Sequence, residues 1–147
     1  MMLTDRIKSD MTAALKSGDA PRLLVLRMLV SEIGYKQIEL QRELKDEDVI
    51  SVIQREAKKR REAIESYREG DREDQALTEE KELEILLGYL PAQMGEGEVR
   101  EEINKVLERL STEEKSDFGK AMRVIAPMFK GRAEGAVVAK IVKEILN

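Results

Sequence analysis

A helical period runs through almost the whole chain and leaves little room for any other secondary structure. Apolar residues recur every three or four positions, as in the stripe formed by Leu3, Ile7, Met11 and Ala14, which is the spacing of one face of an α-helix. Strands would need alternating apolar and polar residues, and no stretch keeps that alternation. The dipeptides typical of tight β-hairpins are also missing. The pattern predicts an all-α protein.

Glycine, proline and aspartate divide this pattern into separate helices. Gly18 ends the first stripe, and Pro21 stands where a first helical residue belongs. Asp46 is the expected N-cap of a third helix, which should end at Gly70. A fourth helix should stop before Pro91, because a residue that precedes proline disfavours the helical conformation.

The segment 91–97 is the one clear linker, with two glycines and one proline in seven residues. We therefore expect an N-terminal helical bundle over residues 1–91, a linker over 92–97 and a small C-terminal helical subdomain over 98–147. Within that subdomain, Ser111-Thr-Glu-Glu114 has the pattern of a capping box and should open a short turn.

Composition excludes several kinds of chemistry. The chain has no Cys and no His, which removes disulfides, thiolate and imidazole metal ligands, and the commonest general base. We expect neither a metal nor a cofactor. No nucleophile–base arrangement or Gly-rich phosphate loop is visible, so no autonomous active site is predicted and enzymatic activity is left open.

Targeting signals are equally scarce. No apolar run approaches the roughly 20 residues of a membrane span, and the first residues do not resemble a signal peptide. We expect a cytoplasmic protein without a membrane partner.

Charge is distributed unevenly along the chain. Residues 1–114 carry 19 basic and 27 acidic side chains, a net charge of −8, whereas residues 115–147 carry 7 basic and 3 acidic side chains, a net charge of +4. An acidic body with a basic tail indicates that an anionic partner such as nucleic acid would meet the tail first. Ordinary fluctuation on a charged surface is the alternative explanation.

Two short amphipathic helices are predicted in this basic tail. In the first, the spacing places Lys120, Arg123, Pro127 and Lys130 on one face. An opposite, core-facing set should contain four large apolar residues, Phe118, Met122, Ile125 and Phe129. In the second helix, Lys140 and Lys143 share an outer face.

The turn between these helices, Gly131-Arg-Ala-Glu-Gly135, combines an arginine with the start of a helix. Free backbone N–H groups at a helix N-terminus, together with a guanidinium group, form a workable phosphate site. The competing interpretation is a simple helix cap at Gly131 with solvated cations around it. The candidate nucleic-acid-binding residues are Lys120, Arg123, Lys130, Gly131, Arg132, Lys140 and Lys143.

A second basic cluster interrupts the apolar stripe of the third helix. It consists of Lys58, Lys59, Arg60 and Arg61, and the two arginines fall on inward positions. The favoured explanation is an ion-pair network with carboxylates such as Glu32, Glu79 or Glu82 across the bundle. Snorkelling past the edge of the core, or lining a groove as a secondary basic face, are the alternatives.

A set of motifs runs nearly end to end through the chain: Arg22-Leu-Leu-Val-Leu-Arg-Met-Leu29, Lys59-Arg-Arg-Glu-Ala-Ile-Glu-Ser-Tyr67, Arg72, Glu79-x-x-Glu82, Tyr89-Leu-Pro-Ala-Gln93, Phe118-Gly-Lys-Ala-Met122 and Lys130-Gly-Arg-Ala-Glu-Gly135. These motifs resemble the GatB/YqeY family, and most closely its free-standing YqeY-type members. The most specific match is to the Gly-x-x-Met and Lys-Gly-Arg-Ala pattern in the tail of GatB, a component of the glutamine-dependent aspartyl/glutamyl-tRNA amidotransferase.

The resemblance implies a helical bundle followed by a tail domain that grips tRNA away from the site of chemistry. Lys120, Arg123, Lys130 and Arg132 lie in the matching motif region. The chain has no counterpart of the large cradle domain of GatB and no amidase serine-lysine machinery, so it cannot run a transamidation alone.

Three functional hypotheses follow. The leading one is an accessory protein that positions tRNA electrostatically through the tail. A helical protein–protein adaptor that uses the bundle near Arg60, Arg61 and the 91–97 segment is the alternative. The third is an amidotransferase-related, carbon–nitrogen ligase component that acts only within a complex, and its partners would be amidotransferase or aminoacyl-tRNA synthetase components.

Overall fold

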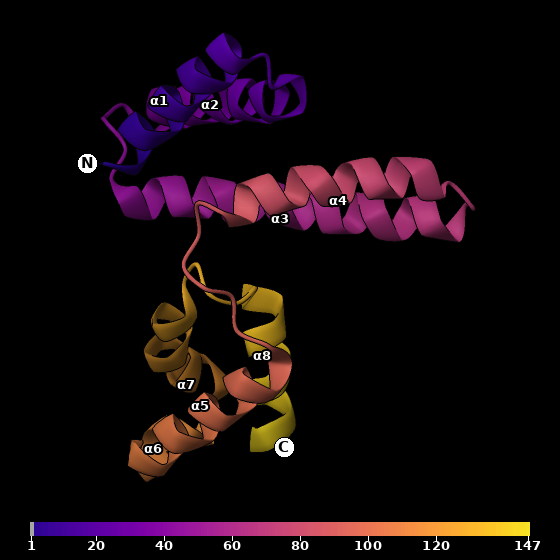
Figure 1. Cartoon of the computed structure of the whole chain (residues 1–147). Coiled ribbons are helices and arrows are strands. Elements are labelled where there is room, and N and C mark those ends of the chain that lie inside the picture. Colours follow the sequence, from indigo (N-terminus) through magenta and orange to yellow (C-terminus); the bar gives the residue numbers. More distant parts are fainter. Residues whose placement is uncertain (1) are drawn as a thin grey trace. The chain divides into compact units, whose positions relative to one another are not determined.

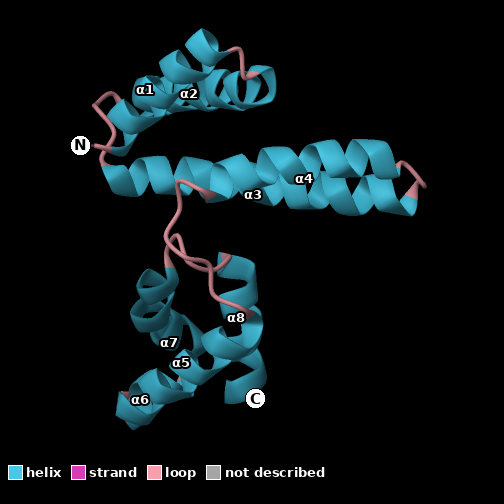
Figure 2. Cartoon of the chain, viewed as in Figure 1, coloured by secondary structure: helices cyan, strands magenta, loops and turns pink. Residues whose placement is uncertain are grey.

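A computed structural model of the chain describes residues 2–147. All regular secondary structure in that range is helical, which confirms the all-α prediction (Figure 2). The chain packs as two compact units that divide after Leu90, so that Pro91 begins the second unit. None of the helices in the described range is long and apolar enough to cross a membrane.

The first unit consists of two helical hairpins (Figure 1). In one hairpin α1 lies beside α2, and in the other the long helix α3 lies beside α4. The corner between the hairpins is the segment between α2 and α3. The helices are α1 (Leu3–Ser17), α2 (Ala20–Leu40), α3 (Asp46–Glu69) and α4 (Glu73–Leu87).

The core of this unit is built from the apolar stripes that the sequence shows. Ile7 of α1, Leu26 of α2 and Ile53 of α3 are fully buried in one cluster. Leu44 follows the end of α2 and is nevertheless buried in the same cluster, where it covers the corner between the hairpins. Burial of each such side chain stabilises the fold by about 1.5–3 kcal/mol.

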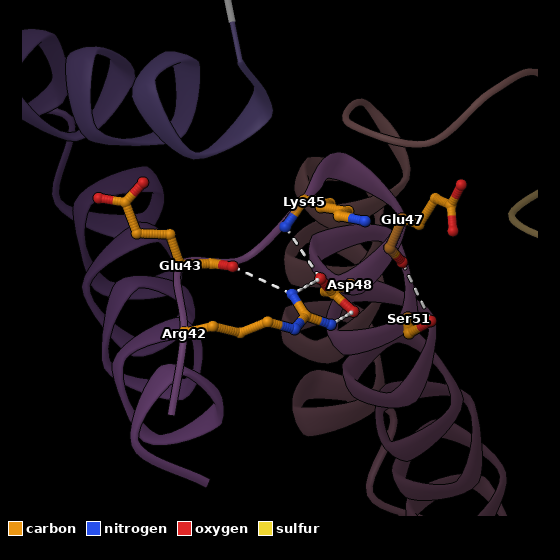
Figure 3. Close-up of polar contacts among 6 residues, drawn as sticks. All are labelled: Arg42, Glu43, Lys45, Glu47, Asp48 and Ser51. Atoms are coloured by element: carbon orange, nitrogen blue, oxygen red, sulfur yellow. Dashed lines mark hydrogen bonds and ion pairs between the residues drawn. The ribbon is translucent and has the colours of Figure 1, made fainter. Parts of the chain in front are cut away.

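The start of α3 differs from the prediction in one detail. Asp46 is the first helical residue, and Lys45 precedes it as the N-cap. The Asp46 carboxylate accepts a hydrogen bond from the backbone N–H of Leu3 at 2.9 Å. Asp48 takes over the capping role, since it accepts the Lys45 N–H at 2.8 Å and the Arg42 guanidinium at 2.7 and 3.1 Å (Figure 3).

Tyr89 closes the first unit. Its ring is buried and lies under the Arg6 guanidinium, 4.8 Å from the ring centroid, and its hydroxyl donates to Asp10 at 2.6 Å. Burial and the bond to Asp10 raise the pKa of Tyr89 to about 12. Tyr89 is therefore a packing residue, because its ring and its hydroxyl both contact side chains of α1.

The second unit contains four α-helices and one 3₁₀ turn in the order α5 (Glu96–Arg109), α6 (Thr112–Ser116), α7 (Phe118–Ile125), η1 (Ala126–Phe129) and α8 (Gly135–Leu146). Val99, Ile103, Ala121, Ile125 and Ile141 are fully buried in one core that α5, α7 and α8 share.

The capping box that opens α6 is confirmed. The Ser111 hydroxyl accepts the Glu114 N–H at 3.2 Å, and the Glu114 carboxylate accepts the Ser111 N–H at 3.1 Å. The segment expected as a linker, 92–97, includes the first two residues of α5.

Candidate nucleic-acid interface

The tail begins with the short helix α7. The Asp117 carboxylate caps it by accepting the Gly119 N–H at 3.0 Å, and Ala121 and Ile125 are buried one turn apart. At 100° per residue, Arg123 points away from that buried pair and Lys120 lies on its flank. Both side chains are exposed, as the predicted outer face requires.

The predicted inner face of this helix is wrong at its first position. Phe118 is 41% exposed, whereas Ile125 and Phe129 are buried and Met122 is half-buried. Phe118 is the first residue of α7, ahead of the turn that meets the core. The exposed ring leaves one aromatic side chain on the surface at the start of α7.

The prediction of one continuous helix from 118 to 130 is also wrong. The α-helix ends at Ile125, and the chain continues as the 3₁₀ turn η1 with Pro127 in its first turn. Proline has no N–H to donate to the carbonyl four residues earlier, so the α-helical ladder cannot pass through it. Lys130 therefore lies beyond the helix rather than on the face that Lys120 and Arg123 share.

The turn after η1 has a defined conformation. Gly131 adopts a φ of +81°, the left-handed region that glycine tolerates. The backbone N–H groups of Arg132 and Ala133 both donate to the Phe129 carbonyl, at 2.8 and 3.0 Å. The side chains of Lys130 and Arg132 are exposed on either side of the buried glycine.

The segment after Pro91 clamps this turn. The Gln93 side-chain amide donates to the carbonyls of Gly131 at 2.7 Å and Pro91 at 2.8 Å, and the Met94 N–H donates to the Arg132 carbonyl at 2.9 Å. Sequence reasoning missed this role of Gln93 and Met94. One signal in the sequence could have indicated the contact. The motifs Tyr89–Gln93 and Lys130–Gly135 belong to the same family resemblance, and both lack helical periodicity.

Glu134 stands at the N-cap position of α8. Its carbonyl accepts the N–H groups of Val137 and Val138, and its side chain makes no capping hydrogen bond. The helix dipole favours negative charge near this end, so an incoming anion would share the position with the Glu134 carboxylate.

Two of the six candidate binding cations of the C-terminal tail already have carboxylate partners. Lys120 binds Glu113 at 2.9 Å, and Lys140 approaches Glu96 at 4.0 Å. Next to Lys140, the Arg100 guanidinium binds Glu144 at 2.7 Å, which holds the pKa of the Glu144 carboxyl below its ordinary value. The remaining four make no ion pair with any residue from 2 to 147 and are exposed: Arg123, Lys130, Arg132 and Lys143.

Charge is segregated within the second unit. From Pro91 to Asn147 the unit carries ten basic and ten acidic side chains and is neutral. Residues 118–147, which form α7, η1, the turn and α8, hold six basic and only two acidic side chains. The basic character of the tail is therefore local to these elements, and an anion would be attracted to them and repelled by α5 and α6.

The second basic cluster differs from the exposed cations of the tail, because Arg60 is enclosed between two helices. Arg60 of α3 binds Glu79 at 3.2 Å and Glu82 at 3.1 Å, both on α4, which confirms the predicted interhelical ion pairs. Burial raises the pKa of the Glu82 carboxyl, Arg60 offsets part of the rise and Glu79 adds to it. Lys59 binds the buried Glu56 at 3.2 Å.

The other two members of that cluster differ in exposure. Lys58 is exposed, whereas Arg61 is half-buried. Among residues 2–147 no group of three or more Asp, Glu, His or Cys side chains could hold a metal ion.

Comparison with known proteins places these motifs in a family. The chain is 30% identical to the mitochondrial protein named altered inheritance of mitochondria protein 41 of Pyrenophora tritici-repentis, over 97% of the chain and 80% of that protein. It is 32% identical to an uncharacterized protein of Schizosaccharomyces pombe, over 58% of the chain and 69% of that protein. The YqeY-like protein family matches residues 4–146. The chain belongs to the YqeY-like family, whose domain is related to the C-terminal region of GatB.

Proposed function

We propose that this protein is a tRNA-binding accessory protein that holds the RNA backbone with α7, the turn after η1 and α8. The observation that carries the proposal is a set of four exposed cations that have no carboxylate partner within residues 2–147, which we call the tail cations: Arg123, Lys130, Arg132 and Lys143. Phosphate contacts dominate the affinity of such interfaces, and they carry no base information.

The clamped turn supports this role. Because Gln93 and Met94 hold the backbone of Gly131 and Arg132, the two flanking cations project from a fixed loop. A fixed loop loses less conformational entropy on binding than a mobile one. The turn would therefore bind a phosphate more tightly than the same two side chains on a mobile segment.

The test is a titration with unmodified tRNA at increasing salt. Four phosphate contacts predict an affinity loss of roughly 100-fold between about 50 and 200 mM salt. The double variant Lys130→Glu/Arg132→Glu should bind tRNA more weakly. The slope of the logarithm of its binding constant against the logarithm of the salt concentration should be less steep by about 2.

A matched control carries the same charge change elsewhere in the second unit. Lys105→Glu/Arg109→Glu alters α5, outside the tail, and should bind tRNA nearly as the parent protein does. Circular dichroism of both variants checks that the helices persist. Undetectable binding at low salt, or equal losses in the two variants, would contradict the proposal.

A protein partner is the second candidate, and a specific observation favours it. Phe118, Val124 and Met128 are exposed apolar residues among the tail cations. A partner with an acidic, amphipathic surface would fit this mixture. Phe118→Ser/Met128→Ser should then abolish binding of such a protein and leave the salt-dependent tRNA titration unchanged. The groove near Arg60 and Arg61 that the sequence suggested for an adaptor role is not needed for this candidate.

Participation in an amidotransferase complex stays a prediction of the family relationship. Glutamine-dependent amidation that appears only when the other components are combined with this chain would support it. Reconstitution that is indifferent to the chain would count against it.

The cytoplasm is the proposed compartment, with a mitochondrial location suggested by the fungal relative's name as the alternative. Cell fractionation would separate the two.

A further inference from the structure

The segment that connects the two units is fastened to the basic turn of the tail. Leu90 still packs against the core of the first unit, and α5 begins only at Glu96. Residues 91–95 lie between them and form what we call the strap. Gln93 and Met94, in the middle of the strap, donate the hydrogen bonds that hold the turn. The same backbone contacts therefore involve both the connection between the units and the candidate anion site.

The side chain of Gln93 suits this position chemically. Its amide nitrogen carries two N–H donors. One bonds the Pro91 carbonyl at 2.8 Å and the other the Gly131 carbonyl at 2.7 Å, so a single group ties the first residue of the strap to the turn. Gly131 lies between the exposed cations Lys130 and Arg132. An anion that contacts both cations would bind side chains whose backbone the strap holds in place.

The strap is held much less firmly than the helices. Pro91, Ala92 and Gln93 are exposed, and Met94 is half-buried against the core of the second unit. Segments with few buried contacts and exposed hydrogen bonds open locally at a far lower cost than that of global unfolding. The strap can therefore exist in two states. In the closed state, which the structure shows, it is bonded to the turn, and in the open state residues 91–95 are free.

We propose that an anion bound by Lys130 and Arg132 favours the closed strap, so that occupancy of the turn controls how much free chain separates the two units. This inference rests on the proposed function, because it uses two of the same cations. A ligand shifts an equilibrium only through a difference in its affinity for the two states. The closed strap fixes the backbone that carries both cations, so the closed state should bind the anion more tightly. By reciprocity, the bound anion must favour closure by the same factor.

Closure changes the length of the free connection. In the closed state only Pro91 and Ala92 separate Leu90 from the bonded Gln93. In the open state the free segment grows from these two residues to the five residues 91–95. Because the span of a flexible chain grows as the square root of its length, the connection lengthens roughly 1.6-fold. Binding of an RNA backbone should thus restrict the motion of one unit relative to the other.

Hydrogen exchange at the Met94 amide tests the coupling directly. This N–H donates to the Arg132 carbonyl and exchanges when the strap opens. Saturation with unmodified tRNA, or with inorganic polyphosphate as a second probe, should slow its exchange by at least about 5-fold. The control is the amide of Lys115, which donates to the Ser111 carbonyl at 3.0 Å at the start of α6. Its exchange should not change.

Gln93→Ala tests the reciprocal effect. The variant loses both side-chain hydrogen bonds of the strap but no charge, and an exposed position tolerates the change. It should bind either anion about 5-fold more weakly. The slope of the logarithm of its binding constant against the logarithm of the salt concentration should stay the same, because the number of phosphate contacts is unchanged. Gln75→Ala, at an exposed glutamine on α4, should bind as the parent protein does.

A distance measurement reports the freedom of the connection itself. The chain has no cysteine, so Ser66→Cys on α3 and Asn104→Cys on α5 place one spin label on an exposed position of each unit. The distribution of label-to-label distances should narrow when polyphosphate or tRNA is added. In the Gln93→Ala background it should be broader and should narrow less.

The outcomes separate this inference from the proposed function. Binding of tRNA without slower exchange at Met94, or without a narrower distance distribution, would overturn the coupling and leave tRNA binding intact. Slower exchange with polyphosphate in a chain that does not bind tRNA would support the coupling and contradict the proposed function. A chain that binds neither probe would overturn both.

Discussion

Arg60 and Arg132 carry the same guanidinium group in two contrasting environments. The Arg60 side chain is 23% exposed and is held between Glu79 and Glu82 of the neighbouring helix. Arg132 lies on an exposed turn, where its backbone is hydrogen-bonded and its side chain has no carboxylate partner among the described residues. An enclosed cation must be compensated within the fold, whereas an exposed one is stable in water and is available to a partner.

Removing the Arg60 charge should have the largest effect on stability. Arg60→Met keeps much of the aliphatic packing but leaves two mostly buried carboxylates facing each other, so we expect a loss of about 2–3 kcal/mol in the free energy of unfolding. Urea denaturation measures it. Lys130→Met at the tail should change stability by no more than about 0.5 kcal/mol.

The triple variant Arg60→Met/Glu79→Gln/Glu82→Gln sharpens this test. It removes all three charges together, and most of the lost stability should return because no uncompensated charge remains. A triple variant as unstable as the single one would show that Arg60 acts through packing rather than through its charge.

Breaking the clamp on the turn should have the next largest effect. Gln93→Glu replaces an amide donor with a carboxylate that faces two carbonyl oxygens, so we expect a destabilisation of about 1–2 kcal/mol. Hydrogen exchange at the amides of Met94, Arg132 and Ala133 should accelerate in the variant. Gln75→Glu, a matched exposed change on α4, should leave those amides protected.

The smallest effect expected is a difference in pH dependence between two glutamates. The folded state raises the pKa of Glu82, so it binds a proton there more readily than the unfolded chain does. Relative to Glu82→Gln, the parent protein should therefore gain stability as the pH falls from above the folded pKa of Glu82 to below 4.5. Urea midpoints at several pH values measure the difference.

Glu144 is the control of opposite sign. The hydrogen bond to Arg100 lowers the pKa of the Glu144 carboxyl in the folded state. The stability that this bond contributes is therefore present at a pH above the ordinary pKa of glutamate, and it is lost as the pH falls through the lowered pKa. Relative to Glu144→Gln, the parent protein should lose stability on acidification. If the stability difference between parent and variant changed in the same direction with pH for Glu82 and for Glu144, the contrast between the enclosed and the exposed ion pair would be contradicted.

The helices and most of their inward faces could be predicted from sequence, because burial imposes a 3.6-residue period that is visible in residues such as Ile7, Ile53 and Ile141. The pairing of Arg60 was predictable for the same reason, since a cation on an inward position requires a carboxylate. The burial of Phe118 was predicted wrongly. Periodicity gives the direction in which a side chain points from its helix, but it does not give the point along the helix where the neighbouring helix ends.

The sequence by itself determined that the chain is helical, that its C-terminal third is basic and that an arginine stands in a glycine-bounded turn. Those properties depend on local spacing and composition. Only the tertiary structure decided which cations are compensated, that Gln93 and Met94 hold the turn, and that Leu24, Tyr35 and Ile38 of α2 stay exposed. Each of these is set by contacts between segments far apart in the chain. No local pattern determines which distant carboxylate, carbonyl or helix a residue contacts in the folded protein.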